Sequence, residues 1–402
     1  MPFISAFLSD RGEEWSPKRL KANEGLAYQG SIVLGMGFVL SPDDAHRMLD
    51  ADPKNAEVIF PYINGDDLNS DPEQRPSRWV INFWDWPEAR AQKYRLPYEW
   101  IEERVKPERA KNARKERRER WWQFAEKTPA LYHSIGRGHP FERHPKDWSP
   151  DNNELARVIA FATQASKYAG FSFVPSDILY SNAVGVIADC SVSLFAELAS
   201  ALHVHWAFAY GGRLETRLRY APTDCFETYP FLPQLQPELN QLGEQLSTLR
   251  RSLMSENGAG ITKIYNQVNS SEQQQNGISA LRDVHCQIDV AVARAYGWDD
   301  IDLEHGFHEI PYLPENDRIR FTISETARIE VLRRLAELNR QRYEEEIAAG
   351  LQNDATSRKT KSAPKGKSVP KKSTGSTAQA GLDFGDSSSK GIRRLHIDHA
   401  KE

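Results

Sequence analysis

The chain has 402 residues with 39% hydrophobic content, so it can bury a substantial core, and we expect two folded units with appendages. Its formal net charge of −4 excludes a uniformly basic nucleic-acid-binding protein but leaves room for a local basic face. Three widely spaced cysteines without a CxxC pair argue against a disulfide scaffold or a zinc ribbon and fit a reducing cytosol.

The N-terminal stretch, residues 1–25, predicts a leader or linker with one apolar patch followed by Pro17 and several charges. It has no basic stretch followed by a sustained apolar run, so we expect no signal peptide. No segment of the chain approaches the roughly 20 apolar residues that cross a bilayer. We therefore expect a soluble, cytoplasmic protein without a membrane partner.

Residues 26–235 predict a mixed-sheet α+β domain. Strands are expected over 28–40, 56–62, 78–84 and, as two strands, 171–190. Helices are expected over 41–50, 87–127 and 193–212. The first of these helices has Ser41 as its N-cap and Pro42 at its first position. In the last, Leu194, Leu198, Leu202 and Trp206 form one i+4 ridge.

The remainder of the chain changes character twice. Residues 236–351 predict a mostly helical domain, interrupted by a Gly, Ser and Gln-rich break over 257–277. Residues 352–402 are rich in Lys, Ser, Pro and Gly and have few large apolar residues, so we expect a disordered basic tail. Its lysines over 355–372 would either add non-specific attraction to DNA or serve no function.

The motifs of several enzyme classes are missing. The sequence VLGMGF contains GxG after a strand, but the apolar run continues where a dinucleotide site needs a third glycine and a helix. We therefore interpret Gly35 and Gly37 as serving a bulge or turn, with Phe38 to Leu40 continuing the strand. There is no Walker A sequence, and no GxSxG sequence supports a serine hydrolase.

The histidines and acidic residues do not form a recognisable catalytic or metal site. His203 and His205 are two positions apart on a predicted helix, so their side chains diverge and cannot chelate one ion. The loop NGDDLNSD could supply general acids or Mg²⁺ ligands, but Asn and Asp more often cap turns. We assign no catalytic residue and no metal ligand.

A basic segment runs from Glu102 to Arg120, with nine Lys or Arg against five Glu, and leads into Trp121, Trp122 and Phe124. One interpretation is a helix held by ion pairs at i±3 and i±4, with its aromatic end in the core. The other is a helix that follows phosphates, because guanidinium groups pair bidentately with phosphate oxygens. The segment alone leaves both open.

Several blocks, taken together, resemble one family: the C-terminal part of bacterial type IIG (MmeI-like) restriction–modification DNA methyltransferases. The blocks are GMGFVLSPDDAHRML, VIFPYINGDDLNSDP, RWVINFWDWPEARA, VKPER with RERWWQF, LHVHW with LRYAPTDCFETYPF, AVARAYGWDDIDL and RFTISETARIEVLRRLAELNRQRYEEE. They span residues 1–350 in the expected order. Such a string of unusual blocks is more specific than any single short motif.

The resemblance implies a DNA target recognition domain with a helical extension, in a system of phage defence. In that family a separate N-terminal domain methylates adenine N6 with S-adenosylmethionine. Its cofactor glycine motif and its Asn-Pro-Pro-aromatic motif do not occur in these 402 residues. We therefore expect no cofactor in this chain, and no catalysis by the chain alone.

Double-stranded DNA is accordingly the expected partner, with a separately encoded methyltransferase or nuclease subunit as a second one. Expected phosphate contacts are Lys106, Arg109, Arg114, Arg117, Arg118, Arg120, Lys167, Arg217 and Arg219. Candidates for reading bases are Asn64, Asp67, Asn69 and Arg78. For the Asn and Asp residues among them, turn formation is the first interpretation, and Trp121 and Trp122 are expected in the core. The alternatives are a subunit of an active split methyltransferase and a non-functional remnant.

Overall fold

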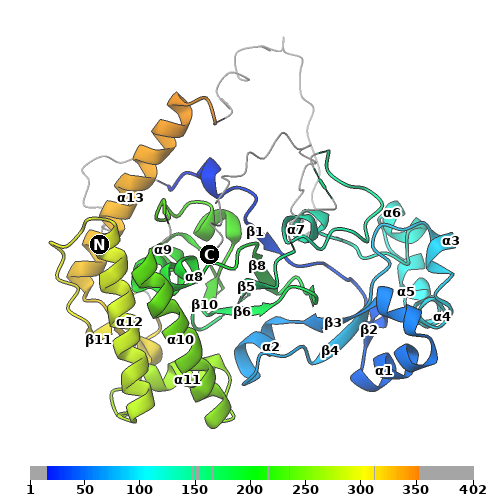
Figure 1. Cartoon of the computed structure of the whole chain (residues 1–402), viewed down its shortest axis with the longest axis horizontal. Coiled ribbons are helices and arrows are strands. Elements are labelled where there is room, and N and C mark those ends of the chain that lie inside the picture. Colours follow the sequence, from blue (N-terminus) through cyan, green and yellow to red (C-terminus); the bar gives the residue numbers. More distant parts are fainter. Residues whose placement is uncertain are drawn as a thin grey trace, which may run out of the picture.

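The computed structural model describes residues 16–146, 148–149, 154–164, 166–214, 217–234, 236–311 and 313–352, and of residues 213, 214 and 316 the backbone alone. The expected α+β class is confirmed. Two four-stranded sheets occupy the centre and one side, and long helices form the other side (Figure 1). Most of the predicted leader and all but the first residue of the predicted tail lie outside the described residues.

One sheet has the strand order β2-β4-β3-β7, in which only β3 and β7 are parallel. Its strands are β2 (Val39–Leu40), β3 (Ile59–Ile63), β4 (Arg78–Ile81) and β7 (Leu179–Tyr180). The strands expected over 56–62 and 78–84 are therefore confirmed. The long strand expected up to Leu40 is wrong in part, because Met36–Phe38 forms a 3₁₀ turn.

The second sheet has the order β1-β8-β5-β6 and is antiparallel throughout. Its strands are β1 (Ala27–Gln29), β5 (Arg157–Ala162), β6 (Phe171–Pro175) and β8 (Val184–Ile187). Side chains of β5 alternate between two cores: Ile159 and Phe161 join the helices, whereas Val158 and Ala160 join the first sheet. Because both faces are buried, β5 has no polar alternation, and the sequence pattern did not predict it.

The helix expected over 87–127 is wrong in its length, because the segment breaks into short helices. These are α3 (Glu88–Ala91), α4 (Arg95–Arg104), α5 (Lys106–Ala110) and α6 (Lys115–Glu119). Pro107 lies at the start of α5, where its missing N–H ends the run of α4. Asn112 then accepts a hydrogen bond from the backbone N–H of Arg114 at 3.0 Å, a local turn that separates α5 from α6.

The single helix expected over 193–212 is also two helices, α8 (Val192–Ala199) and α9 (Ala201–Tyr210). Ser200 between them is extended and caps α9 by accepting from the N–H of His203 at 3.3 Å. No single helix in the described parts of the chain is long and apolar enough to cross a membrane. The α8–α9 pair, bent by 61°, passes that test of length and composition only when the two are taken together.

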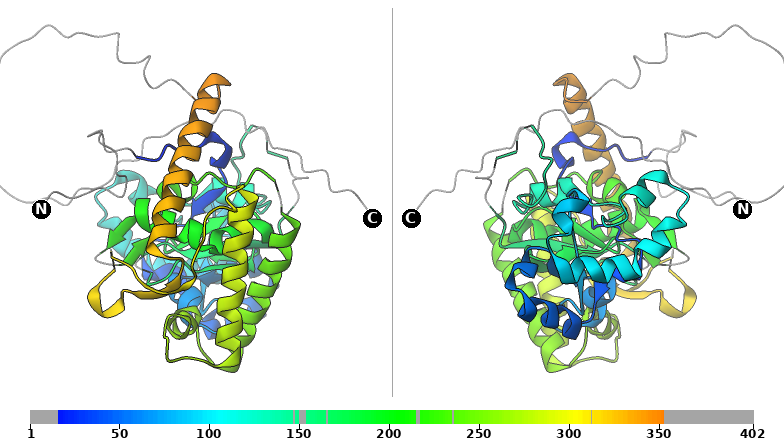
Figure 2. Two further views of the ribbon diagram at one scale, coloured as in Figure 1. Left: turned by 90° about the vertical axis from the view of Figure 1, so that its left-hand side faces the viewer. Right: turned by 90° about the vertical axis from the view of Figure 1, so that its right-hand side faces the viewer.

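Four further helices belong to the helical side: α10 (Pro237–Glu256), α11 (Ile261–Val268), α12 (Asn276–Ala295) and α13 (Glu325–Ala348). Between α12 and α13 lies the hairpin of β11 (Gly306–Glu309) and β12 (Ile319–Thr322). Neither α11 nor this hairpin was expected from the sequence. Figure 2 shows the C-terminal part of α13 extending beyond the rest of the described core.

The remaining helices are α1 (Pro42–Ala51), α2 (Gly65–Ser70) and α7 (Pro129–Ser134), and the hairpin of β9 (Gly212–Leu214) and β10 (Arg217–Arg219) follows α9. The helix expected over 41–50 is confirmed as α1, with Ser41 accepting from the N–H of Asp44 at 3.1 Å. One hydrophobic core contains side chains from all the helices α8 through α13 and from one face of the second sheet. Buried contacts therefore cross the boundary expected at residue 235 between the two domains.

Candidate nucleic acid interface

Arg109, one of the expected phosphate contacts, points into the protein. Arg109 is 2% exposed, and its Nη2 donates a hydrogen bond to the carbonyl of Val33 at 2.8 Å. The guanidinium lies 5.7 Å from the ring centre of Phe38, and desolvation lowers the pKa of Arg109. The predicted phosphate role of Arg109 is therefore wrong, because the side chain is enclosed and bonded to a backbone carbonyl.

The other five expected contacts of the basic segment lie on its outer side, mostly with partners. Lys106 and Arg120 each pair with the glutamate four residues earlier, at 2.7 and 3.3 Å. Arg117 lies 3.6 Å from a carboxylate of the loop after α6, and Arg118 donates to two backbone carbonyls at 2.7 and 3.0 Å. Arg114 is exposed and has no side-chain partner among the described residues. Surface pairs are weak, about 0.2 to 1 kcal/mol, so phosphate oxygens can replace these carboxylates.

The aromatic end of the segment lies in the core, as expected. Trp121, Trp122 and Phe124 are 5%, 7% and 3% exposed. The indole Nε1 of Trp122 donates to the carbonyl of Trp86 at 2.9 Å, and the ring of Phe124 meets that of Phe38 edge-on at 5.3 Å. The segment is thus a hybrid of the two interpretations, with a buried aromatic floor, one buried arginine and an ion-paired outer surface.

Three further expected contacts, Lys167, Arg217 and Arg219, are brought together by strand pairing. Ser166 and Leu218 exchange two backbone hydrogen bonds of 3.1 Å, which places Lys167 beside β10. Arg217 and Arg219 are exposed and flank the buried Leu218, so they share one face of the strand. Figure 1 shows β10 on the side of the helices, away from α5 and α6. Lys167 itself pairs with the carboxylate of Asp317 at 2.9 Å. The expected phosphate contacts thus fall on two separate basic surfaces, one at α5 and α6 and one at β10.

The candidates for base reading have different environments. Asn64 caps α2, accepting from the backbone N–H groups of Asp66 and Asp67 at 2.7 and 3.3 Å, while the Asp67 carboxylate accepts from the N–H of Asn64 at 2.9 Å. Asp67 is 6% exposed, so it has a capping role and little surface for a base edge. Asn69 is half-buried, and Arg78 is exposed at the start of β4. Base reading by Asn69 and Arg78 stays a prediction.

Gly35 and Gly37 serve the backbone, as interpreted from the sequence. Gly35 has a φ of +125°, which favours glycine. A Cβ at Gly37 would come within 2.8 Å of Arg104 Cβ and of Val105 Cγ2, so α4 packs directly on this residue.

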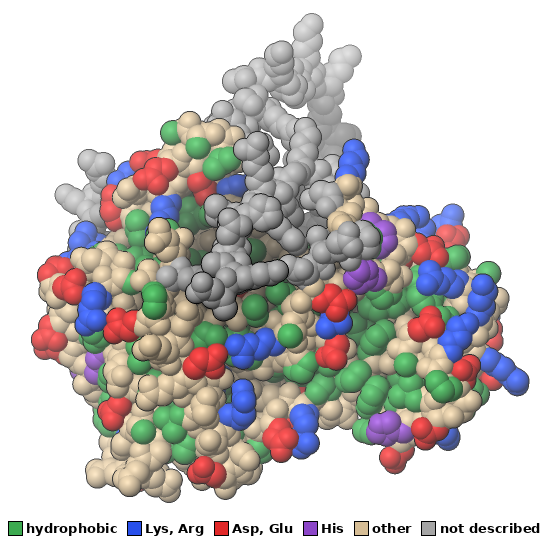
Figure 3. Space-filling model, viewed as in Figure 1, with side chains coloured by type: hydrophobic (Ala, Val, Ile, Leu, Met, Phe, Trp, Pro, Cys, Tyr) green, Lys and Arg blue, Asp and Glu red, His purple; other side chains and the backbone are tan. Residues whose placement is uncertain are grey.

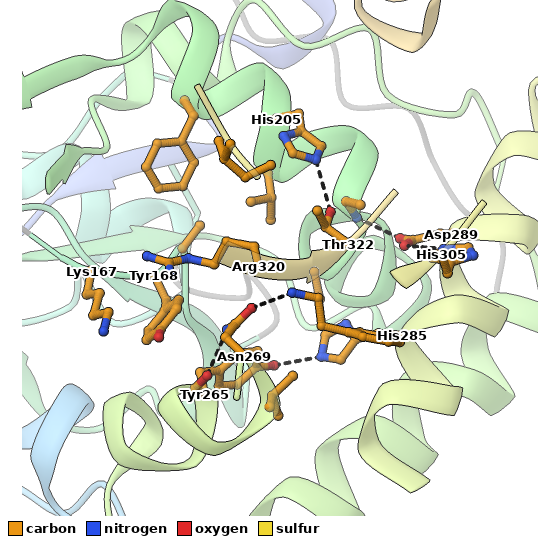
Figure 4. Close-up of a pocket in the computed structure, with 18 of the residues that line it drawn as sticks. Lys167, Tyr168, His205, Tyr265, Asn269, His285, Asp289, His305, Arg320 and Thr322 are labelled. Carbon is orange, nitrogen blue, oxygen red and sulfur yellow. Dashed lines mark hydrogen bonds and ion pairs between the residues drawn. The ribbon is translucent and has the colours of Figure 1, made fainter. Parts of the chain in front are cut away.

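A cavity of about 120 Å³ lies between residues 167–171 and the helical side (Figure 4). His285 and the hydroxyl of Tyr265 are 2.9 Å apart on one wall, and His205 and the hydroxyl of Thr322 are 3.0 Å apart on another. Desolvation lowers the pKa of His205 to about 3 and that of His285 to about 4, so both rings are neutral at pH 7. Apart from the histidines themselves, no feature of the sequence indicated this cavity. Within the described residues, no group of His, Cys, Asp and Glu could hold a metal ion.

Comparison with known proteins supplies the context for these surfaces. The family model for the MmeI target recognition domain matches residues 18–233. DNA methyltransferase A of Bacillus subtilis (strain 168) is 29% identical over 151 residues, which are 38% of this chain and 16% of that protein.

Among solved structures, the type IIL restriction–modification enzyme MmeI in complex with DNA superposes with a TM-score of 0.53 and 16% identity. The superposition covers 83% of this chain and 38% of the MmeI chain, so this chain spans well under half the length of both relatives. With the family model matching more than half of its residues, the chain belongs to the MmeI target recognition domain family.

Proposed function

We propose that the chain binds double-stranded DNA in a sequence-specific manner, as the target recognition part of an MmeI-like type IIG restriction–modification system. The observation that carries this proposal is the match of the target recognition family over residues 18–233. The MmeI relative was solved with DNA, and the fold is shared with it. The two basic surfaces are chemically suited to phosphates, although the chain as a whole is acidic.

The proposal divides the interface between positioning and reading. Arg114, together with the exchangeable ion pairs of α5 and α6, would contact one stretch of phosphates, and Lys167, Arg217 and Arg219 another. Asn69 and Arg78 would contact base edges, since amide and guanidinium groups form bidentate bonds with adenine and guanine. We assign S-adenosylmethionine and methyl transfer to a separate methylase domain or polypeptide.

Binding to fluorescently labelled duplexes of random sequence, measured by anisotropy from about 50 to 200 mM salt, tests the DNA binding and phosphate contacts of this proposal. The logarithm of the affinity should fall linearly with the logarithm of the salt concentration, by about 0.9 per phosphate contacted. Arg217→Ala with Arg219→Ala should reduce this slope, whereas Arg333→Ala, an exposed arginine on α13 outside the family match, should not. Absence of duplex binding at about 50 mM salt would overturn the proposal.

A second candidate is a subunit of an active split methyltransferase. The observation that favours it is the coverage of the relatives, 38% of the MmeI chain and 16% of DNA methyltransferase A. Methylome sequencing of the host with and without this gene should then show loss of one adenine-N6 methylation motif. An unchanged methylome together with absent duplex binding would instead identify a non-functional remnant.

A further inference from the structure

The loop from Val33 to Phe38 presents two apolar side chains to solvent. Met36 is 69% exposed, more than any other large hydrophobic residue that the structure describes, and Leu34 is 37% exposed. Leu34 has a φ of +52° and Gly35 a φ of +125°. A branched side chain at positive φ is a strained conformation, so the surrounding structure must impose it.

The loop is held firmly at both ends. Ile32 and Glu126 exchange two backbone hydrogen bonds of 3.0 and 3.1 Å, and Phe38 is fully buried. Arg109 donates to the carbonyl of Val33 at 2.8 Å, and the indole of Trp100 donates to the carbonyl of Gly37 at 3.0 Å. The tip is therefore a rigid projection and not a flexible loop that happens to be exposed.

Holding the loop requires burial of a charge. The Nε of Arg109 has no hydrogen-bond partner among the described residues, although it is buried. A buried guanidinium with an unpaired N–H is unfavourable. The arrangement keeps Leu34 and Met36 in water at a cost in stability, which is the pattern expected of a contact surface.

Charges of both signs lie beside the tip, and the basic segment that packs on it carries an excess of Lys and Arg. The guanidinium of Arg104 stacks on Trp100 at 3.6 Å, and its one ion pair among the described residues is with the neighbouring Glu103. Farther along the segment, Lys111 and Arg114 are exposed without a side-chain partner among the described residues. A Cβ at Gly35 would lie 3.2 Å from Glu108 Oε2, so one carboxylate stands directly beside the tip. Figure 3 shows hydrophobic side chains gathered over the half with β2–β4 and α3–α6, with Lys and Arg interspersed with Asp and Glu along its outer edge.

We propose that Leu34 and Met36 form an apolar wedge that enters a base step of duplex DNA from the minor groove, while the cations around them contact the flanking phosphates. Apolar wedges of Leu, Met, Ile, Phe or Pro unstack a step and bend the duplex. The inference rests on the proposed DNA binding and adds to it a deformation of the duplex at one fixed place.

The experiment uses the full chain and a duplex selected by the wild-type protein from a random library. The duplex carries 2-aminopurine at successive positions, with a donor and an acceptor fluorophore at its ends. Wild-type protein should raise 2-aminopurine fluorescence at one step and shorten the end-to-end distance. The variant Leu34→Asn with Met36→Ser should lose both signals and bind roughly tenfold more weakly, with the same salt slope because the phosphate contacts remain.

The variant is chosen so that folding is not at issue. Asn tolerates positive φ, and both positions are exposed, so its thermal midpoint should not fall. Ile347→Ser, which removes a 47% exposed apolar residue on α13, is the matched control and should keep both signals.

The outcomes separate the two proposals. Tight binding by the wild-type protein without unstacking or bending overturns the wedge alone, as does a double variant that still bends the duplex. If the double variant bends DNA but no longer associates with a methylase polypeptide, the loop is a protein-docking surface and the wedge is refuted. Failure of the wild-type protein to select any duplex overturns both proposals.

Discussion

Replacing Arg109 by alanine should destabilise the protein by about 3 kcal/mol. The change removes a hydrogen bond from a charged donor, worth about 1.5 to 3 kcal/mol, and leaves the Val33 carbonyl unpaired, at a cost of about 1 to 3 kcal/mol. It also empties a buried volume beside Phe38. Relief of the buried charge offsets part of this sum, because desolvation of an ion costs several kcal/mol.

Two companion variants separate these contributions. Arg109→Met keeps most of the apolar volume and removes the charge, so its loss should be about 1 to 2 kcal/mol, mainly from the unpaired carbonyl. Arg114→Ala, in the same basic segment but exposed, should change stability by less than about 0.5 kcal/mol. Equilibrium unfolding in urea provides the three values.

The same variants test the corrected role of Arg109 against the phosphate role. A buried arginine releases no counterion on binding, so Arg109→Met should leave the salt slope unchanged, whereas Arg114→Ala should lower it by about one unit. The reasoning is refuted if Arg109→Ala is as stable as the wild-type protein and lowers the slope by a full unit. That result would mean that the guanidinium faces the duplex.

Three other predictions follow from particular contacts. Burial raises the pKa of Glu197 to about 7 from 4.5, so the folded state retains a proton that the unfolded chain loses. Relative to Glu197→Gln, the wild-type protein should then lose on the order of 3 kcal/mol of stability as the pH rises from about 4.5 to 7. Urea unfolding of both proteins at the two pH values measures this difference. The prediction is refuted if the two proteins change in stability by the same amount. Gly37→Ala should lower the unfolding free energy by about 1 to 3 kcal/mol, because the new Cβ would press on α4. In Gly212→Ala the nearest described atom would be 3.6 Å from the new Cβ, so the loss of unfolding free energy should be smaller. Equal losses of the two variants in thermal unfolding would refute the close packing of Gly37 on α4. Arg217→Ala and Arg219→Ala should each lower the salt slope of duplex binding by about one unit, in anisotropy titrations, without changing the melting temperature, and an unchanged slope would remove β10 from the interface.

Local signals in the sequence predicted local structure well. The Ser41 cap, the strands β3 and β4 and the burial of Trp121 and Trp122 all follow from residue type and spacing within a few positions. The family of the recognition domain was identified from ordered blocks of sequence and is confirmed. These features depend on neighbours along the chain, which a sequence displays directly.

The failures arise where a distant partner decides the outcome. Ser200 breaks an apparently continuous helix, and the Asp289 carboxylate accepts the N–H of Ala201 at 2.6 Å from a helix nearly ninety residues later. Strand β5 is apolar on both faces because two cores meet on it. The composition of the basic segment does not distinguish Arg109 from its basic neighbours. The carbonyl that accepts its hydrogen bond belongs to Val33, which is distant in the sequence.

The contact between Arg109 and Val33 also changes how the basic segment relates to the rest of the interface. The two hydrogen bonds between Ile32 and Glu126 and the packing of Phe38 on Phe124 join the apolar loop to the far end of the same segment. The apolar tip and the cations of α5 and α6 therefore form one rigid unit, so little conformational entropy is lost when they contact a partner together. A wedge in this setting senses the ease with which a base step opens, which depends on DNA sequence without any base-edge contact. Direct reading of bases must then come from other surfaces, of which the exposed side chain of Arg78 on β4 is the first to test.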